Sequence, residues 1–418
     1  MRYRFILIIV SLFSALSLFG QNIEIDGYAR SYIGVLTNDT HDYSILQNTF
    51  DLKFHKGLSK AGFFANPYVY QYPNQNINID LREAYVDLYF DNMDLRIGKQ
   101  QIIWGKADGV FITDLVSPKD LSEFLLRDFE EIRTGITSIK ADYYFGNNTV
   151  ECVWIPVFVP TKMPDESSRW SRIPTFLIPT QTDYSMKDIP ENTDESEIFF
   201  KYSGMTSALD YEVLAGSFYE DDPTIHIEKK VDPVAGTPFL QLTPQHHRLN
   251  MIGGSFSTDI KGKVFRGEGA YYTGKVFPAM DSYDIPTLTL DKDYLYYLLG
   301  FDFNIGETKM STQFIQKAIL DYESSIVAEE FDNTITFLMS RNCLRETLTA
   351  QLFTYIGLNN SDALIRPSLS YDFSDGFEIS LGANLFYRNE TSVEPDISEM
   401  FGYFDTNDMF YTKVKFSF

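Results

Sequence analysis

Short and long connections alternate between the predicted strands of this chain. Segments with a side-chain period of two recur from residue 22 to the C-terminus, and no helical period is sustained beyond a short stretch. The even-numbered strands end in tight turns, such as Asp91-Asn92 and Ser374-Asp375-Gly376. The odd-numbered strands are often followed by long connections, which cover 105–132, 158–194, 221–244, 275–290 and 390–403. A barrel that crosses the bacterial outer membrane has short turns on one side and long loops on the other.

The sequence therefore predicts an all-β fold, a transmembrane antiparallel up-and-down β-barrel of about 18 strands, within a range of about 16 to 18. A soluble β-sandwich or propeller is the alternative, but neither is expected to sort its loops by length. The predicted strands cover 22–35, 43–56, 60–71, 77–90, 93–104, 133–145, 148–157, 195–203, 207–220, 245–258, 261–274, 291–305, 307–321, 332–342, 345–357, 361–374, 376–389 and 404–418.

The last predicted strand ends the chain on an aromatic residue. Its alternate residues form an apolar-leaning face and a polar face, which is typical of a membrane-spanning barrel strand. The first face holds Phe410, Thr412, Val414, Phe416 and Phe418, and the second holds Tyr411, Lys413, Lys415 and Ser417. A terminal phenylalanine in this setting resembles the signal by which bacterial outer-membrane barrels are handed to their insertion machinery. We therefore expect Val414, Phe416 and Phe418 to form a barrel-assembly signal, with that machinery as a partner.

The N-terminus has the features of a secretory signal peptide. Arg2 and Arg4 precede an apolar run over residues 5–19, which gives way to Gly20. The run is shorter than the roughly 20 residues that a membrane helix needs, and its basic start and small-residue exit favour cleavage. We expect a signal peptide over 1–20 and an outer-membrane barrel over 21–418, and the alternative is a retained helical anchor.

Composition limits the expected partners. The chain of 418 residues is 44% hydrophobic, but no second long apolar run follows the signal peptide, which excludes helical membrane spanning. The net charge of -23 argues against nucleic acid and favours a water-filled pore that tolerates cations, or loops that bind divalent ions at a lipopolysaccharide surface. Outer-membrane lipids and lipopolysaccharide are thus expected partners; a solvated acidic surface without a ligand is the alternative. The chain has two cysteines, Cys152 and Cys343, and their distance in the sequence argues against a disulfide framework.

The strand pattern also predicts which charged side chains face the lumen. Only one face of each strand meets lipid, so an apolar face directs the other residues inward. On this argument the inward side chains are Glu83, Asp87, Arg96, Gln100, Trp104, Lys140 and Asp142. They form either a charged ladder that orders permeating solutes or a set of paired charges that fills the lumen.

The connection over 105–132 is too apolar to lie free in water, since it contains Phe124, Leu125, Leu126 and Phe129. We infer that it folds into the barrel mouth as a constriction or partial plug, because a barrel of this size would otherwise enclose a wide channel. Its acidic residues Asp108 and Asp114 complete the candidate lumen and constriction residues.

One region resembles a known family. Arg96, Gly98 and Gln100 form the pattern R-x-G-x-Q, and Trp104-Gly105, residues 117–122 (SPKDLS), Arg133 and the proline-rich segment 155–160 follow it. This order resembles the alginate-export and porin-like group of outer-membrane barrels, which includes a large branch known only as a domain of unknown function. The resemblance covers roughly residues 77–165 and implies a pore or exporter channel without catalytic chemistry. The acidic chain departs from the basic lumen of a polyanion exporter, so an alginate substrate is not carried over.

Enzymatic chemistry is the competing class of function. His246-His247 could join Glu220, Asp221 or Asp222, as in barrels with catalytic pairs near the outer rim, but this spacing is not specific. No phosphate loop, dinucleotide fingerprint or zinc spacing is present, so we expect no enzyme, no cofactor and no metal. The sequence predicts a porin-like channel in the bacterial outer membrane for passive or gated passage of small solutes. The alternative is a surface-exposed adhesin or envelope scaffold with a closed lumen.

Overall fold

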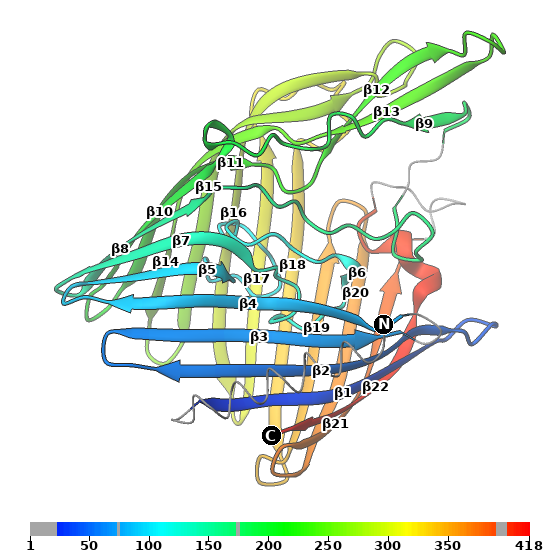
Figure 1. The fold of residues 1–418 in the computed structure, drawn as a ribbon. Coiled ribbons are helices and arrows are strands. Elements are labelled where there is room, and N and C mark those ends of the chain that lie inside the picture. The colour runs from blue at the N-terminus through cyan, green and yellow to red at the C-terminus, as the bar shows by residue number, and fades with distance from the viewer. Residues whose placement is uncertain (1–22, 73–75, 173–175, 390–398) are drawn as a thin grey trace, which may run out of the picture.

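The computed structural model describes residues 23–72, 76–172, 176–389 and 399–418. The predicted signal peptide over 1–20 lies outside these residues. The described part forms a closed antiparallel barrel of 18 strands (Figure 1). Each strand pairs with the next around the wall, and β22 closes the barrel by pairing with β1. The predicted fold class is therefore confirmed.

The wall strands are long and follow the predicted ranges closely. Their bounds are β1 (Glu24–Leu36), β2 (Tyr43–Gly57), β3 (Ala61–Gln71), β4 (Asn78–Tyr89), β5 (Met93–Gln100), β7 (Ile136–Phe145), β8 (Asn148–Ile155), β10 (Glu197–Met205), β11 (Asp210–Tyr219), β14 (Arg248–Asp259), β15 (Val264–Ala279), β16 (Leu288–Ile305), β17 (Thr308–Ile319), β18 (Phe331–Cys343), β19 (Leu348–Gly357), β20 (Asp362–Ser374), β21 (Phe377–Tyr387) and β22 (Met409–Ser417).

Smaller elements lie in the long connections at one end of the barrel. The strands β9 (Thr180–Thr182), β12 (Thr224–Val231) and β13 (Pro238–Gln245) form a separate three-stranded sheet, seen at the top of Figure 1. These segments were predicted as loops, so the three-stranded sheet was not predicted. The remaining elements are the short strand β6 (Ser122–Leu125) and the 3₁₀ helices η1 (Thr193–Glu195) and η2 (Gly402–Asn407). No helix in the described ranges is long and apolar enough to cross a membrane.

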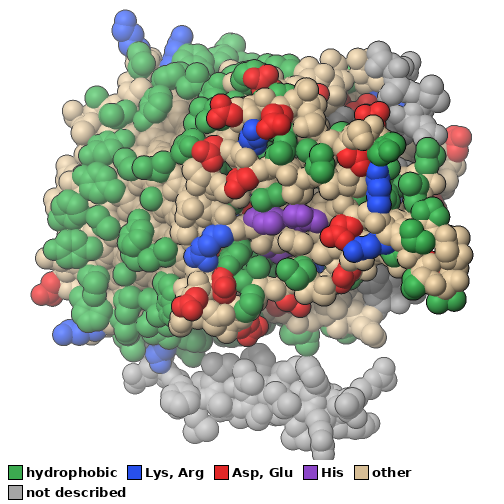
Figure 2. All heavy atoms as spheres, turned by 90° about the horizontal axis from the view of Figure 1, so that it is seen from above, with side chains coloured by type: hydrophobic (Ala, Val, Ile, Leu, Met, Phe, Trp, Pro, Cys, Tyr) green, Lys and Arg blue, Asp and Glu red, His purple; other side chains and the backbone are tan. Residues whose placement is uncertain are grey.

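The two faces of each wall strand differ in exposure as the period of two requires. On β22, Phe410 and Phe416 are 63% and 49% exposed on the outer face, whereas Lys413 and Lys415 turn toward the interior. Apolar side chains cover the wall side at the left of Figure 2, and charged and histidine side chains gather over the loop end. This distribution is typical of a barrel whose outer face meets lipid.

The predicted strand over 93–104 ends earlier than expected, at Gln100. The backbone N–H of Ile102 donates to Ser117 Oγ at 2.8 Å, and that of Trp104 donates to Asp114 Oδ1 at 2.9 Å. After Gln100, the backbone N–H groups of Ile102 and Trp104 therefore bond to side chains of the following connection and not to a neighbouring strand. The side chain of Trp104, which lies beyond the end of this strand, is only 2% exposed and packs in an interior cluster of the barrel.

Candidate functional site

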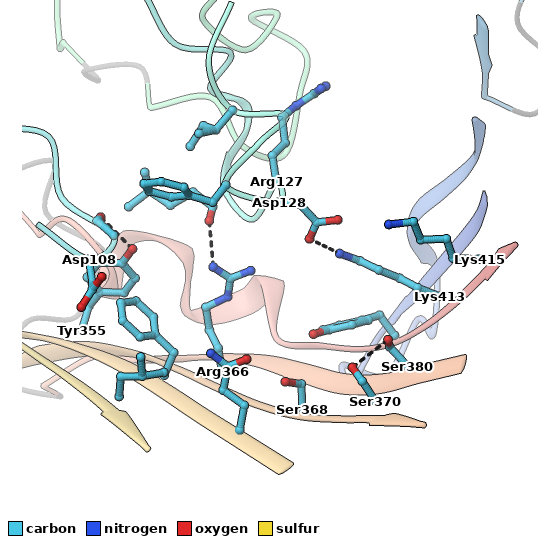
Figure 3. A pocket seen from close by; sticks show the side chains of 18 of the residues that line it. Asp108, Arg127, Asp128, Tyr355, Arg366, Ser368, Ser370, Ser380, Lys413 and Lys415 are labelled. Atoms are coloured by element: carbon cyan, nitrogen blue, oxygen red, sulfur yellow. Dashed lines mark hydrogen bonds and ion pairs between the residues drawn. The ribbon is translucent and has the colours of Figure 1, made fainter. Parts of the chain in front are cut away.

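A short stretch of the connection between β5 and β7 is held against the barrel wall by charged side chains. We call residues 125–131 the crossing segment. Arg366 on β20 donates to the carbonyl oxygens of Leu125 at 3.0 Å and Leu126 at 3.2 Å (Figure 3). Phe124, just before the segment, packs against Phe404, with ring centroids 4.7 Å apart. The segment is thus attached to β20 and to the aromatic residues of the last long connection.

Further along, ion pairs attach the crossing segment to the first and last strands. Arg30 on β1 contacts Asp128 and Glu131, each at 2.9 Å. Lys413 on β22 contacts the other carboxylate oxygen of Asp128, as Figure 3 shows. Arg30 is 7% exposed and the Glu131 side chain is mostly buried, whereas the Asp128 side chain is 46% exposed. Charge-assisted hydrogen bonds from the buried guanidinium hold the segment at this point.

Three cavities lie around the crossing segment at successive depths. The outer cavity, of about 860 Å³, is lined by the loop-side ends of β2 and β3, including Tyr43 and Tyr70, and by Lys162 and Trp170. The inner cavity, of about 510 Å³, reaches toward the turn-side ends of β20, β21 and β22.

The narrow cavity, of about 20 Å³, lies between the other two, as the residues that they share show. Its lining includes Tyr70 and Lys162, which also line the outer cavity, and Arg30, which also lines the inner one. Arg127 lines all three. The narrow cavity has room for about one water molecule, and we infer that it is the constriction of a route from the loop end into the barrel.

Basic side chains outnumber acidic ones along this route. The narrow cavity is lined by the basic Arg30, Arg82, Arg127 and Lys162 and by the acidic Asp120 and Glu131. The inner cavity is lined by the basic Arg30, Arg127, Arg366, Lys413 and Lys415 and by the acidic Asp108, Asp128 and Glu378. Hydroxyl groups of Ser368, Ser370 and Ser380 face the same space in Figure 3. The local charge thus opposes the net charge of the chain.

Most of the predicted lumen residues lie on another part of the wall, where they contact one another. Asp87 accepts from Arg96 Nε at 2.6 Å, and Lys140 Nζ donates to Asp142 at 2.6 Å. Glu83 accepts from the N–H of Gln101 at 2.8 Å. None of these residues lines the three cavities. The contacts of Asp87 with Arg96 and of Lys140 with Asp142 are those of paired charges, the second of the two interpretations considered above, whereas Glu83 binds a backbone N–H.

The remaining predicted residues make hydrogen bonds and ion pairs within the long connection, between it and the barrel wall, or within the wall. Gln100 Nε2 donates to the carbonyl oxygen of Ser138 at 3.2 Å, and Trp104 Nε1 donates to Glu151. Asp114 accepts from the N–H of Trp104 and pairs with Arg133. Asp108 pairs with Arg266 on β15 and is the one predicted residue that lines the inner cavity.

Sequence reasoning missed the basic residues that line the route. The alternation in the last strand does place Lys413 and Lys415 on the inner face, and the same alternation in 361–374 places Arg366 there. The inward direction of these three side chains could therefore have been predicted from the strand pattern. Arg30 and Arg127 acquire their role only through the path of the crossing segment, which strand periodicity does not specify.

The C-terminal residue takes part in closing the barrel. Gly27 and Phe418 exchange two backbone hydrogen bonds, of 3.1 Å and 3.0 Å. The side chains of Val414, Phe416 and Phe418 are exposed on the outer face. Their role as an assembly signal stays a prediction.

The histidines at the loop end contact one another and the backbone. His226 Nε2 and His247 Nε2 are 2.8 Å apart, and His246 Nδ1 is 2.7 Å from the carbonyl oxygen of Glu220. Burial lowers the pKa of all three imidazoles. The Glu220 carboxylate pairs with Lys275. In the described ranges, no group of three or more His, Cys, Asp or Glu side chains is placed to hold a metal ion.

Comparisons with known proteins agree with the barrel fold. Residues 70–339 match a family described as a protein of unknown function (DUF1302). The part of the resemblance that concerned a barrel family of unknown function is therefore confirmed, whereas its alginate-export part has no support here. No curated protein matches the chain.

Several solved outer-membrane proteins have a similar fold at low identity. OccK2 (OpdF) of Pseudomonas aeruginosa has a TM-score of 0.56 at 10% identity, with 95% of this chain and 97% of that chain covered. OccAB2 of Acinetobacter baumannii has a TM-score of 0.55 at 10% identity, covering 95% and 98%. The outer membrane protein opdK of Pseudomonas aeruginosa has a TM-score of 0.53 at 8% identity, covering 95% and 99%.

Proposed function

This chain belongs to DUF1302, a family of proteins of unknown function, and we propose that it is a porin-like channel for small solutes in the bacterial outer membrane. The observation that carries the proposal is the series of three cavities that share Arg127 inside a closed barrel of 18 strands. A barrel with an apolar outer face and a charged, hydrated interior is suited to passage of polar solutes across a membrane. The protein acts without catalytic chemistry or a cofactor.

The apolar outer face and the loops gathered at one end support the membrane location. Outer-membrane lipids and lipopolysaccharide are the proposed surroundings, and the barrel-insertion machinery is the proposed assembly partner. The outward aromatic side chains Phe416 and Phe418 are accessible for such recognition.

We further propose that the constriction favours small organic anions. Arg30, Arg82, Arg127 and Lys162 surround the narrow cavity, and rings of basic side chains select anions in pores. Two similar barrels were solved with vanillate and with glucuronate, both of which carry a carboxylate. The acidic composition of the whole chain predicts instead that cations are tolerated, and the two expectations are separable by experiment.

Passage needs no change in the barrel wall. A solute enters the wide outer cavity, gives up part of its hydration at the narrow cavity and gains contacts to guanidinium groups there. It then reaches the inner cavity, where Arg366 and Lys415 have no ion pair with described residues and are available to a solute anion. Weak successive sites of this kind allow both entry and release.

Uptake into proteoliposomes tests both parts of the proposal. Glucuronate and glucose have similar size but differ in charge, and the purified full-length barrel supplies the only path. We expect both sugars to enter faster than in protein-free vesicles, with glucuronate ahead. Entry of glucose alone would contradict the anion preference. Exclusion of both by a folded barrel would contradict the channel itself and favour the adhesin or scaffold.

A further inference from the structure

We propose that the Arg127 side chain is the movable gate of the constriction, whereas the other arginines there are fixed parts of its wall. This inference rests on the proposed channel function. It assigns the regulation of the route to one side chain, which adjusts the opening while the crossing segment and the barrel stay in place.

The position of Arg127 is the first observation. Its side chain borders the outer, narrow and inner cavities, so it lies where they meet. In Figure 3 its guanidinium points away from the inner cavity, whereas the neighbouring Asp128 points toward Lys413. A side chain at this junction decides how wide the connection between the cavities is.

The second observation is how the other two arginines of the constriction are held. Arg30 contacts Asp128 and Glu131 at 2.9 Å and is almost fully buried. The Arg82 guanidinium lies 4.6 Å from the centroid of the Tyr68 ring and 3.6 Å from Asp51. Arg82 also lies 3.9 Å from Glu131, so moving either arginine breaks contacts between the wall and the crossing segment.

Arg127 is held differently. Its contacts to the carboxylates of Asp120 and Glu123 are both 3.4 Å long, and its one shorter hydrogen bond, of 3.0 Å, goes to Ser122 Oγ. All three partners belong to the same connection as Arg127. Its Nε has no hydrogen-bond partner among the described residues. Rotation of this side chain therefore breaks none of the hydrogen bonds and ion pairs described above between the connection and the barrel wall.

Space for the rotated side chain exists next to it. The outer cavity of about 860 Å³ adjoins the narrow cavity of about 20 Å³. When the guanidinium swings into the outer cavity, its volume is added to the constriction and its charge stays near the entrance. An arriving anion competes with Asp120 and Glu123 for the guanidinium and favours this movement.

Single-channel recordings of the full-length barrel test the gate. Arg127→Ala removes the bulk of the gate, and we expect the main conductance to rise by a factor of about two or more, as a widened constriction requires. Arg127→Lys keeps a charge on a slimmer side chain and should give an intermediate conductance. Arg345→Ala, in a turn at the opposite end, is the matched control and should leave the conductance unchanged.

Glu123→Gln loosens the gate without removing it. Glutamine still accepts the hydrogen bond of Tyr72, so the segment keeps that contact. We expect more frequent steps to a higher conductance level, with the folded barrel intact on gel electrophoresis. If the wild-type barrel conducts but Arg127→Ala and Glu123→Gln both behave like wild type, the gate is wrong and the channel stands. If the wild-type barrel itself is silent, the proposed channel function fails first.

Discussion

Arg366 holds the crossing segment through neutral oxygens. It donates to Leu125, to Leu126 and to Asn384 Oδ1, and it makes no ion pair with described residues. Its charge therefore remains available to the inner cavity while its hydrogen bonds fix the segment. One side chain thus positions the crossing segment and also attracts a solute anion.

Replacing Arg366 by glutamine should weaken both the attachment of the crossing segment and the attraction of anions, while the barrel still folds. Loss of the two bonds to the segment is expected to lower the free energy of unfolding by about 2 kcal/mol, because hydrogen bonds from charged donors have that magnitude. Urea unfolding measures this change, and the reversal potential should shift away from anions. An unchanged reversal potential would show that Arg366 is structural only.

Gly98 on β5 allows a close approach of two strands. Its φ is +135°, and a Cβ added there would lie 2.3 Å from the carbonyl oxygen of Ala84. We expect Gly98→Ala to destabilise the barrel by about 2 kcal/mol or more, since both the backbone conformation and the space exclude a side chain.

The fraction of folded barrel that migrates differently before and after heating measures the effect of Gly98→Ala. Gly57→Ala at the end of β2 is the control, because a Cβ there has nothing within 4 Å. Equal folded fractions for the two variants would contradict the account of this strand pair.

At the scale of elements, the connection between β5 and β7 turns a wide barrel into a constricted one. Its apolar residues Trp104 and Val116 pack against wall residues such as Phe199 and Tyr272 in one interior cluster. Phe124 and Leu126 pack in a second cluster with Phe404. Burial of apolar surface thus holds the connection inside, and the ion pairs set its position.

Deleting residues 122–130 should widen the route. Most of the crossing segment and its anchoring aromatic residue are then absent, and we expect a several-fold larger single-channel conductance. Phe124→Ser, with the segment intact, should give a smaller rise. Unchanged current through a deletion variant that still forms the barrel would show that this connection does not limit passage.

The outer three-stranded sheet should loosen at acidic pH. Burial, together with the charges of His226 and Lys275, lowers the pKa of His247, and burial also lowers that of His226. The folded sheet therefore binds fewer protons than the unfolded segment, so its stability is lost as the pH falls through and below the ordinary histidine pKa of about 6.5.

Limited proteolysis of the β12–β13 hairpin at pH 7.5 and 5.5 measures this loosening. Cleavage of the wild-type chain should be faster at the lower pH. His226→Gln should reduce the difference, because only one imidazole then remains in the pair. A pH effect of equal size in this variant would assign the loosening to other groups.

At the scale of the whole molecule, the sequence predicted the barrel far better than the route through it. A period of two assigns an inner and an outer face to every strand, and turn residues mark where strands end, so the wall strands follow from local patterns. The ion pair of Asp87 with Arg96 also joins neighbouring strands whose alternation is visible in the sequence.

The route was harder to predict because it depends on contacts between distant parts of the chain. Arg127 and Arg366 line the same inner cavity only because a connection that follows no strand period passes β20. The sheet formed by β9, β12 and β13 was missed because β9 pairs in parallel with β13, which lies more than fifty residues further along the chain. Net charge does not specify the charge of the interior, since it averages loops and lumen.

Planar-bilayer recording of the wild-type barrel in a potassium chloride gradient is the most direct test of the central claim, that this barrel encloses a route with a basic constriction. We predict discrete conductance steps and a reversal potential of the sign that chloride preference gives. A reversal potential of the opposite sign would contradict the basic constriction, and a folded barrel without steps would contradict the route itself.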